Sequence, residues 1–200
     1  MDAHISAMSR PSNREKILTE GLRVVHERGF AGASVRDIVR AAGVPQGSFT
    51  NHFASKEAFG LDVIDLYFSR ARATIEATLR DRTRPPLTRL RAYFEARKHR
   101  LLEDGMRKGC LFGNFTAEAS EHSEPIRTRI IEVFDYSAAA IAECLRAAVA
   151  AGEVPADLDC QDVAAFVVAS LQGAILLSKA ERSLAPVERL ATLLFAKILR

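Results

Sequence analysis

Closely spaced signals for the starts and ends of helices fill the first quarter of the chain, and they constrain the fold more than any other feature. The sequence SNRE at 12–15 is a capping box, in which two side chains satisfy backbone N–H groups at a helix start. Apolar residues then recur at helical spacing as far as Gly29, a residue type that commonly ends helices. Ser34 and Asp37 form a second cap, followed by an apolar stripe that ends at Gly43. These signals predict two amphipathic helices in close succession.

A short polar segment lies between Gly43 and the next helix cap at Ser55. We predict a helix from about Gln46 to Phe53, with Phe49 and Phe53 docked inward on Ile38 and Ala42 of the preceding helix. Two helices joined by a tight glycine-containing turn are typical of a helix-turn-helix, whose second helix enters the DNA major groove. The outer face would present hydrogen-bonding groups and a glycine that permits close approach: Gln46, Gly47, Ser48, Thr50, Asn51 and His52. The alternative is a solvated connection, because short motifs also arise by chance.

Basic residues near this segment are candidates for contacts with DNA phosphates. Lys56 lies at the start of the next helix, where a cation and free backbone N–H groups together favour a phosphate. Further candidates, which would position the protein without reading the base sequence, are Arg10, Arg14, Lys16 and Arg36.

The rest of the chain also reads as helical, and no stretch alternates with the period of two expected of strands. Prolines at 85–86, 125 and 186 and a cap at Asp159 separate long amphipathic segments. We predict an all-α protein of about nine helices.

Composition narrows the functional classes. The net charge of +3 is small, so positive charge for nucleic acid must be local. The three cysteines lack a Cys-x-x-Cys pair and the five histidines lack ligand spacing, so we expect no disulfide scaffold, no metal site and no cofactor. No apolar run reaches the roughly 18 residues of a membrane span, and no signal peptide is visible, so we expect a cytoplasmic protein without membrane contact.

The N-terminal segment resembles the DNA-binding domain of the TetR/AcrR family of bacterial transcriptional regulators. The resemblance covers Ser12 to about Leu66 and rests on the ordered elements RGF, SVRDIVRAAGV, GSF, HF and SKE. It implies an all-helical homodimer that binds a double-stranded DNA operator of two-fold symmetry and represses until a small molecule binds. It also implies phosphate contacts from Ser34, Arg36 and Lys56. Where the family commonly has tyrosine this chain has Thr50, so its operator can differ from those of better-known members.

The same resemblance suggests three segments. These are a flexible N-terminal arm at 1–11, a helix-turn-helix domain at 12–56 and a ligand-binding and dimerisation domain at 57–200. The last two helices, 161–181 and 187–199, are apolar over wide faces, and Ala165, Ala169 and Gly173 allow close approach. We expect them to form a four-helix dimer interface; burial inside a monomeric bundle is the alternative.

The stretch KGCLFGN resembles a subgroup of these regulators that responds to reactive electrophiles or to small acids such as acrylate. By that resemblance Cys110 is a candidate sensor. A position near a helix N-terminus, with Arg107 and Lys108 adjacent, favours a thiolate. The alternative is a small buried apolar residue, the usual role of a free cysteine.

A non-covalent effector pocket is the rival to covalent sensing. Arg97 can pair bidentately with a carboxylate. Apolar and polar candidates for the walls are Tyr93, Phe94, Phe112, Phe115, Phe134, Asn114 and Gln172, although each of them can instead belong to the core. Two other functional classes remain open from sequence alone, a helical-bundle enzyme acting on small aldehydes or acids and an interaction module that does not bind DNA.

Overall fold

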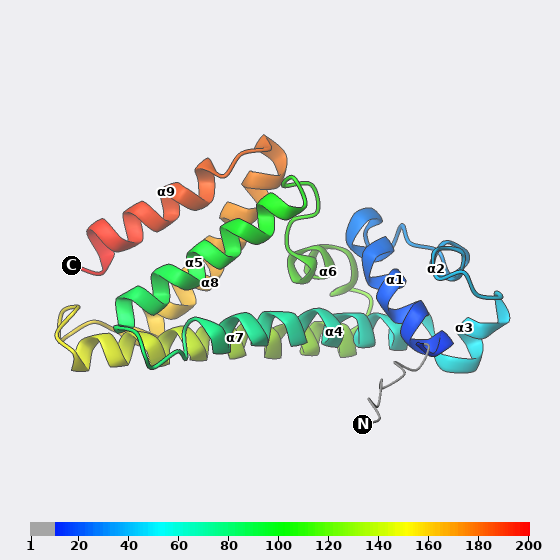
Figure 1. Ribbon diagram of the computed structural model, residues 1–200, viewed down its shortest axis with the longest axis horizontal. Helices are drawn as coiled ribbons and strands as arrows, with labels where there is room; N and C mark the ends of the chain where they lie inside the picture. Colours follow the sequence, from blue (N-terminus) through cyan, green and yellow to red (C-terminus); the bar gives the residue numbers. More distant parts are fainter. Residues whose placement is uncertain (1–10) are drawn as a thin grey trace, which may run out of the picture.

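The computed structural model describes residues 11–200, and these residues form an all-α fold (Figure 1). The predicted arm at 1–11, apart from its last residue, and the predicted phosphate contact Arg10 lie outside the described residues. The elements are α1 (Asn13–Arg28), α2 (Val35–Ala41), α3 (Gly47–His52), α4 (Lys56–Ala77), α5 (Pro86–Glu103), α6 (Leu111–Ala119), α7 (Glu124–Ala150), α8 (Cys160–Glu181), α9 (Ala185–Leu193) and a terminal π-helical turn, η1 (Leu194–Ile198).

The helix caps predicted from the sequence are present. The Ser12 hydroxyl accepts from the Glu15 N–H at 3.2 Å, and the Glu15 carboxylate accepts from the Ser12 N–H at 2.7 Å, which completes the capping box. The Ser34 and Ser55 hydroxyls accept the N–H groups of Asp37 and Ala58 and so cap α2 and α4. Asp159 accepts two N–H groups at the start of α8. Local side-chain chemistry therefore fixes where these helices begin.

The last helix differs from the prediction. We expected one helix over 187–199, whereas α9 ends at Leu193 and the chain continues as η1. The Leu199 N–H donates to the Leu194 carbonyl at 3.0 Å, which is the wider i to i−5 spacing of a π-helix. This wider turn brings Leu194 and Leu199 to the same side, and both are buried.

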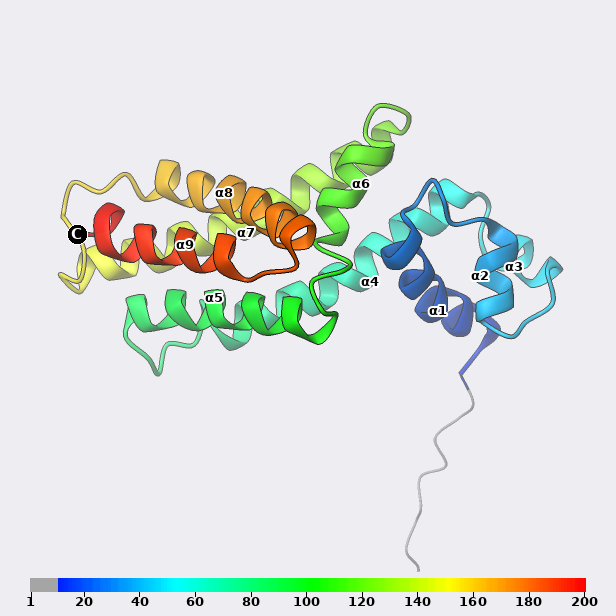
Figure 2. The same cartoon turned by 90° about the horizontal axis from the view of Figure 1, so that it is seen from above.

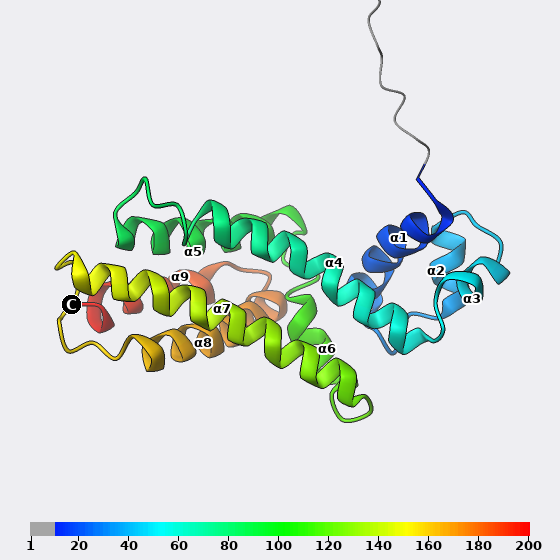
Figure 3. The ribbon, with the colours of Figure 1, turned by 90° about the horizontal axis from the view of Figure 1, so that it is seen from below.

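The helices form two groups that α4 connects. Helices α1–α3 lie at one end of the molecule, and α5, α7, α8 and α9 pack together at the other (Figures 1 and 2). Helix α4 packs against α1 at its start and against α7 further on, and α6 lies between the two groups (Figure 3). A displacement of α4 or α6 therefore acts on both groups.

Helix α8 is long and apolar enough, by length and composition, to cross a membrane, although only 33% of its apolar window is buried. Ser170, Gln172 and Gly173 interrupt its apolar run, which is why the sequence predicted no span here, but they do not lower the average hydropathy of the helix below that of a membrane span. Its exposed positions share one side of the helix and include Phe166, Leu176 and Leu177, at 45%, 67% and 51% exposed.

Candidate nucleic-acid interface and effector cavity

Helix α3 is anchored by three aromatic rings. Phe49 and Phe53 are buried, and their ring centroids lie 5.3 and 5.2 Å from the ring of Phe59 at the start of α4. Phe59 in turn packs against Gly21 of α1, where an added Cβ would come within 2.4 Å of the ring. The sequence predicted the inward phenylalanines but not Phe59 as their partner. The cluster holds a six-residue helix that is too short to be stable alone.

The outer face of α3 carries most of the predicted readers. Gln46, Thr50, Asn51 and His52 are exposed. The Thr50 hydroxyl donates to the Gly47 carbonyl at 3.1 Å, so its donor is already used within the helix. Ser48 differs from the rest because it is buried, with only 8% of its surface exposed.

Gly47 is the first residue of α3, and neither its backbone conformation nor the packing around it requires a glycine. Its φ is not positive, and a Cβ built on it would meet no atom within 4 Å. Alanine would favour the helix by about 1 kcal/mol. An exposed glycine with open space around it is typical of a backbone that another molecule approaches closely.

The predicted phosphate contacts have different surroundings. Arg36 is exposed, and no ion pair to it is found within residues 11–200. Ser34 is occupied as the α2 cap, donating to the Asp37 carboxylate at 2.6 Å. The Lys56 ammonium donates to the Ala31 carbonyl at 3.3 Å and lies 4.9 Å from the centre of the Phe30 ring. Burial lowers the pKa of Lys56, and Glu118 partly opposes this effect.

Two further basic candidates lie on α1. Arg14 pairs with Asp62 at 2.6 Å and is half exposed, while Lys16 is half-buried. Arg14 would therefore have to exchange the Asp62 carboxylate for a phosphate in order to contact DNA.

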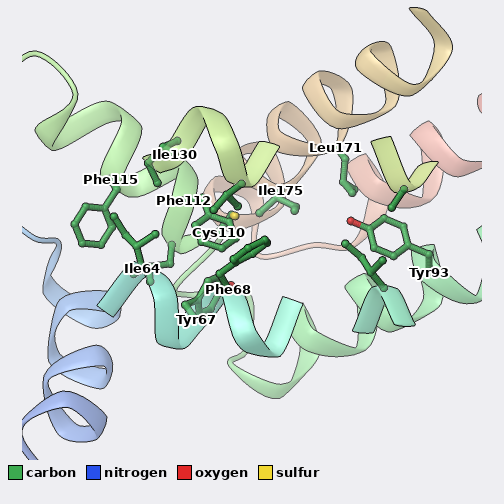
Figure 4. Close-up of a cluster of buried hydrophobic side chains, with 14 of the residues drawn as sticks. Ile64, Tyr67, Phe68, Tyr93, Cys110, Phe112, Phe115, Ile130, Leu171 and Ile175 are labelled. Carbon is green, nitrogen blue, oxygen red and sulfur yellow. The ribbon is translucent and has the colours of Figure 1, made fainter. Parts of the chain in front are cut away.

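A cavity of about 20 Å³ lies between α4, α5, α6, α7 and α8, and five of the predicted pocket residues line it. It is large enough for about one water molecule. The predicted residues in its lining are Tyr93, Arg97, Phe112, Phe134 and Gln172. Its other walls are apolar and include Ile75, Ile141, Val168 and Leu171. Phe115 lies far from Tyr93 and Leu171 (Figure 4), and its ring packs against that of Phe30 at 4.9 Å. Phe94, also predicted for the pocket, is buried against Phe195 at 5.9 Å instead.

Cys110 occupies the position before the first residue of α6, near the helix N-terminus as the sequence suggested, and it is buried. Its basic neighbour in space is Arg97, whose Nη2 lies 4.0 Å from the Cys110 Sγ. Arg107 is exposed, and Lys108 pairs instead with Glu27 at 3.6 Å. Sequence adjacency therefore identified the wrong basic partners, because Arg97 is one helix earlier in the chain.

Cys110 also lines a second, open groove of about 420 Å³ between α6 and α8. This groove has mostly apolar walls, including Ile175, Leu176 and Gly173. Its polar lining residues are Asn114, Thr116, Glu118, Gln172 and Lys179. The Asn114 amide donates to the Lys108 carbonyl at 3.2 Å, which fixes the loop before Cys110. The thiol thus has Arg97 on one side and an apolar groove on the other.

His26 connects α1 to the loop that carries Cys110. Its Nε2 lies 3.1 Å from the Gly109 carbonyl, and its ring meets Tyr67 edge-on at 5.4 Å. Burial lowers the pKa of His26, and the bond to Gly109 opposes this only in part. The neutral imidazole therefore belongs to the folded state.

We expect the protein to lose stability as the pH falls from 7.5 to 5.5. A histidine with a lowered pKa contributes its full stability above its unfolded pKa of about 6.5, and that stability is lost as the pH falls toward the folded pKa. Urea unfolding at both pH values, compared with His26→Gln, measures the effect. An equal pH dependence in the variant would contradict this assignment.

Within residues 11–200 no group of three or more histidine, cysteine, aspartate or glutamate side chains could hold a metal ion.

Comparisons with known proteins agree with this architecture. Residues 17–62 match the family described as bacterial regulatory proteins, tetR family, and residues 86–194 match the tetracyclin repressor-like C-terminal domain. The chain is 40% identical to the HTH-type transcriptional repressor DhaR of Mycobacterium sp. (strain GP1), covering 96% of this chain and 95% of that protein.

Solved structures show the same fold. The regulatory protein TetR from Rhodobacter sphaeroides matches with a TM-score of 0.88 and 30% identity, over 94% of this chain and 99% of that one. The reduced form of E. coli NemR matches with a TM-score of 0.79 and 26% identity, over 94% and 98%. The chain belongs to the TetR family, as a helix-turn-helix DNA-binding transcriptional repressor and not an enzyme.

Proposed function

We propose that α3 reads the major groove of a palindromic operator, with Gln46, Thr50, Asn51 and His52 facing the bases. The observation that carries this proposal is the exposed glycine at 47, which has open space for a DNA backbone and no structural role inside the chain. Gln and Asn can pair bidentately with adenine, and the Thr50 methyl can contact thymine. Ser48 is the weakest member of the predicted set, because its burial leaves it little surface to offer. Phosphate contacts from Ser34, Arg36 and Lys56 complete the proposed interface.

The operator would be bound by a homodimer formed through α8 and the C-terminal helix. Between residues 165 and 180 every exposed position of α8 is small or apolar: Ala165, Phe166, Ala169, Gly173, Leu176, Leu177 and Ala180. A Cβ on Gly173 would meet no atom within 4 Å, so packing within this chain does not require a glycine there either. An unpartnered apolar face of this size is typical of an interface, and small residues let two helices approach.

The domain assignment follows from these two surfaces. Residues 12–56 would carry DNA recognition, and residues 57–200 would carry effector binding and dimerisation. A repressor that acts on bacterial DNA works in the cytoplasm.

The effector would be a small molecule that acts at Cys110 and the adjacent cavity. The Arg97 guanidinium lies 4.0 Å from the Cys110 Sγ, and Cys110 stands at the start of α6 beside an open groove that a small electrophile could enter. The resemblance of the Gly-Cys-Leu stretch to electrophile-responsive regulators also supports an effector that acts at Cys110. The alternative of a non-covalent ligand uses the same Tyr93, Arg97, Phe134 and Gln172 walls.

Release of DNA tests the covalent form of this proposal. Alkylation of Cys110 by iodoacetamide is expected to lower operator affinity, measured by fluorescence anisotropy with mass spectrometry to confirm the site. Cys110→Ser is expected to bind operator normally, and its operator affinity should not change on treatment with iodoacetamide. Cys160→Ser is the matched control and should still respond. Full operator binding by protein alkylated at Cys110 would refute covalent sensing there.

A further inference from the structure

The DNA-binding end of the molecule carries little net charge for a protein that binds a polyanion. Residues 12–62 contain seven lysines and arginines and six aspartates and glutamates. Regions that bind DNA are usually strongly basic, because each cation that neutralises a phosphate releases counterions and adds affinity. Four of the five arginines in this range are already paired with carboxylates: Arg14, Arg23, Arg28 and Arg40.

Arg14 lies at the C-terminal end of α3. Its guanidinium carbon is 5.4 Å from the centre of the Phe53 ring, and Phe53 directly follows the last residue of α3. The start of α1, which carries Arg14, lies beside α3 and the first turns of α4 (Figure 1). The side chains of Arg14 and its partner Asp62 are 47% and 35% exposed. An unpaired arginine at this position would be placed to contact the phosphates that flank the bases facing α3.

Asp62 occupies this arginine and has no other partner. Its Oδ2 accepts from the Arg14 Nη2 at 2.6 Å, and Asp62 makes no other side-chain hydrogen bond or ion pair with residues 11–200. Asp37, by contrast, pairs with two arginines but also accepts the hydroxyl of Ser34, the cap residue of α2. Solvent-exposed ion pairs add little to folding stability, because water already screens the two charges. Stability therefore gives little reason for a carboxylate at position 62, whereas its charge acts directly on the arginine beside α3.

We propose that Asp62 limits the affinity of this protein for DNA of any sequence by cancelling the charge of Arg14. This inference rests on the proposed DNA contact through α3 and names a residue that regulates it. If Arg14 stays on Asp62, it makes no phosphate contact. If Arg14 moves to a phosphate, it leaves an unpaired carboxylate beside the negatively charged DNA. Both arrangements remove the gain that a basic residue normally brings, so binding depends more on the contacts between α3 and the bases.

The Asp62→Asn variant tests this proposal, because it removes the carboxylate and keeps the size of the side chain. Its affinity for a mixed-sequence duplex is measured by fluorescence anisotropy between about 50 and 200 mM salt. We expect binding about tenfold tighter than that of the natural sequence at about 100 mM salt, and a salt dependence steeper by about one for each protomer on the duplex. Adding Arg14→Gln to Asp62→Asn should remove this gain and return the affinity and the salt dependence to those of the natural sequence.

Asp65→Asn is the matched control. Asp65 is also an aspartate of α4, but it pairs with Arg129 of α7 rather than with an arginine near α3. The change should alter the affinity less than about twofold, because salt screens a charge that lies away from the DNA contact. Circular dichroism and urea unfolding check that all variants remain folded.

Three results would overturn the proposal. An equal gain in Asp65→Asn would assign the effect to net charge alone, and a gain that persists without Arg14 would assign it to simple repulsion by Asp62. Unchanged binding by Asp62→Asn across the salt range would show that the ion pair has no effect on DNA affinity. A mixed-sequence duplex requires no base reading, so a failure of the proposed base contacts leaves this comparison measurable. An unchanged Asp62→Asn variant, in turn, leaves the base contacts of α3 standing.

Discussion

The Gly47→Ala variant is expected to be more stable than the natural sequence and yet to bind operator DNA at least about tenfold more weakly. The gain in stability, about 1 kcal/mol or less, follows because alanine is the better helix former and the added methyl meets no atom of the protein. The loss in binding follows if DNA occupies the space at Gly47, because inserting a methyl into a close-packed contact costs about 1–3 kcal/mol.

Urea unfolding and anisotropy with an operator duplex measure the two effects separately. Gly43→Ala is an informative comparison, because Gly43 also has open space but a φ of +63°, so alanine there should destabilise the turn. Unchanged operator affinity of Gly47→Ala would place the DNA backbone away from the start of α3.

The Leu177→Asp variant is expected to be monomeric and to lose operator affinity by about a hundredfold or more. Leu177 lies on the apolar side of α8 with half of its surface exposed, and a carboxylate there would have to be buried without a partner in a dimer. Two linked half-site contacts gain about 10²–10⁴ in affinity over one, so separation of the protomers removes that gain.

Analytical ultracentrifugation gives the oligomeric state, and circular dichroism confirms that the helices persist. Leu102→Asp is the matched control, since Leu102 is an exposed leucine on α5, away from α8. A dimer that persists in Leu177→Asp, or a monomer that retains full operator affinity, would contradict the proposed interface.

The sequence predicted the fold well where local chemistry decides it. Four helices are capped by side chains that hydrogen-bond to backbone N–H groups two or three residues away: Ser12, Ser34, Ser55 and Asp159. Such local bonds do not depend on how the rest of the chain folds. The end of the last helix was mispredicted, because the π-turn depends on burying Leu194 and Leu199 together.

The candidate sites were predicted only in part, for the same physical reason. The outer face of α3 follows from helical periodicity, but the burial of Ser48 depends on packing against other helices. The partner of Cys110 is Arg97, 13 residues earlier, which no local pattern indicates. Phe115 was assigned to the pocket by its aromatic type, yet the direction of α6 turns it toward Phe30.

In the proposed function this chain reads DNA as a symmetric dimer through α3. Selection from a random pool of duplexes by the purified full-length protein, near physiological salt, tests it most directly, with Leu177→Asp and Gly47→Ala run in parallel. We predict enrichment of a palindromic motif by the natural sequence and far weaker enrichment by both variants. Failure of the natural sequence to enrich any motif, or enrichment of a motif without two-fold symmetry, would contradict the account.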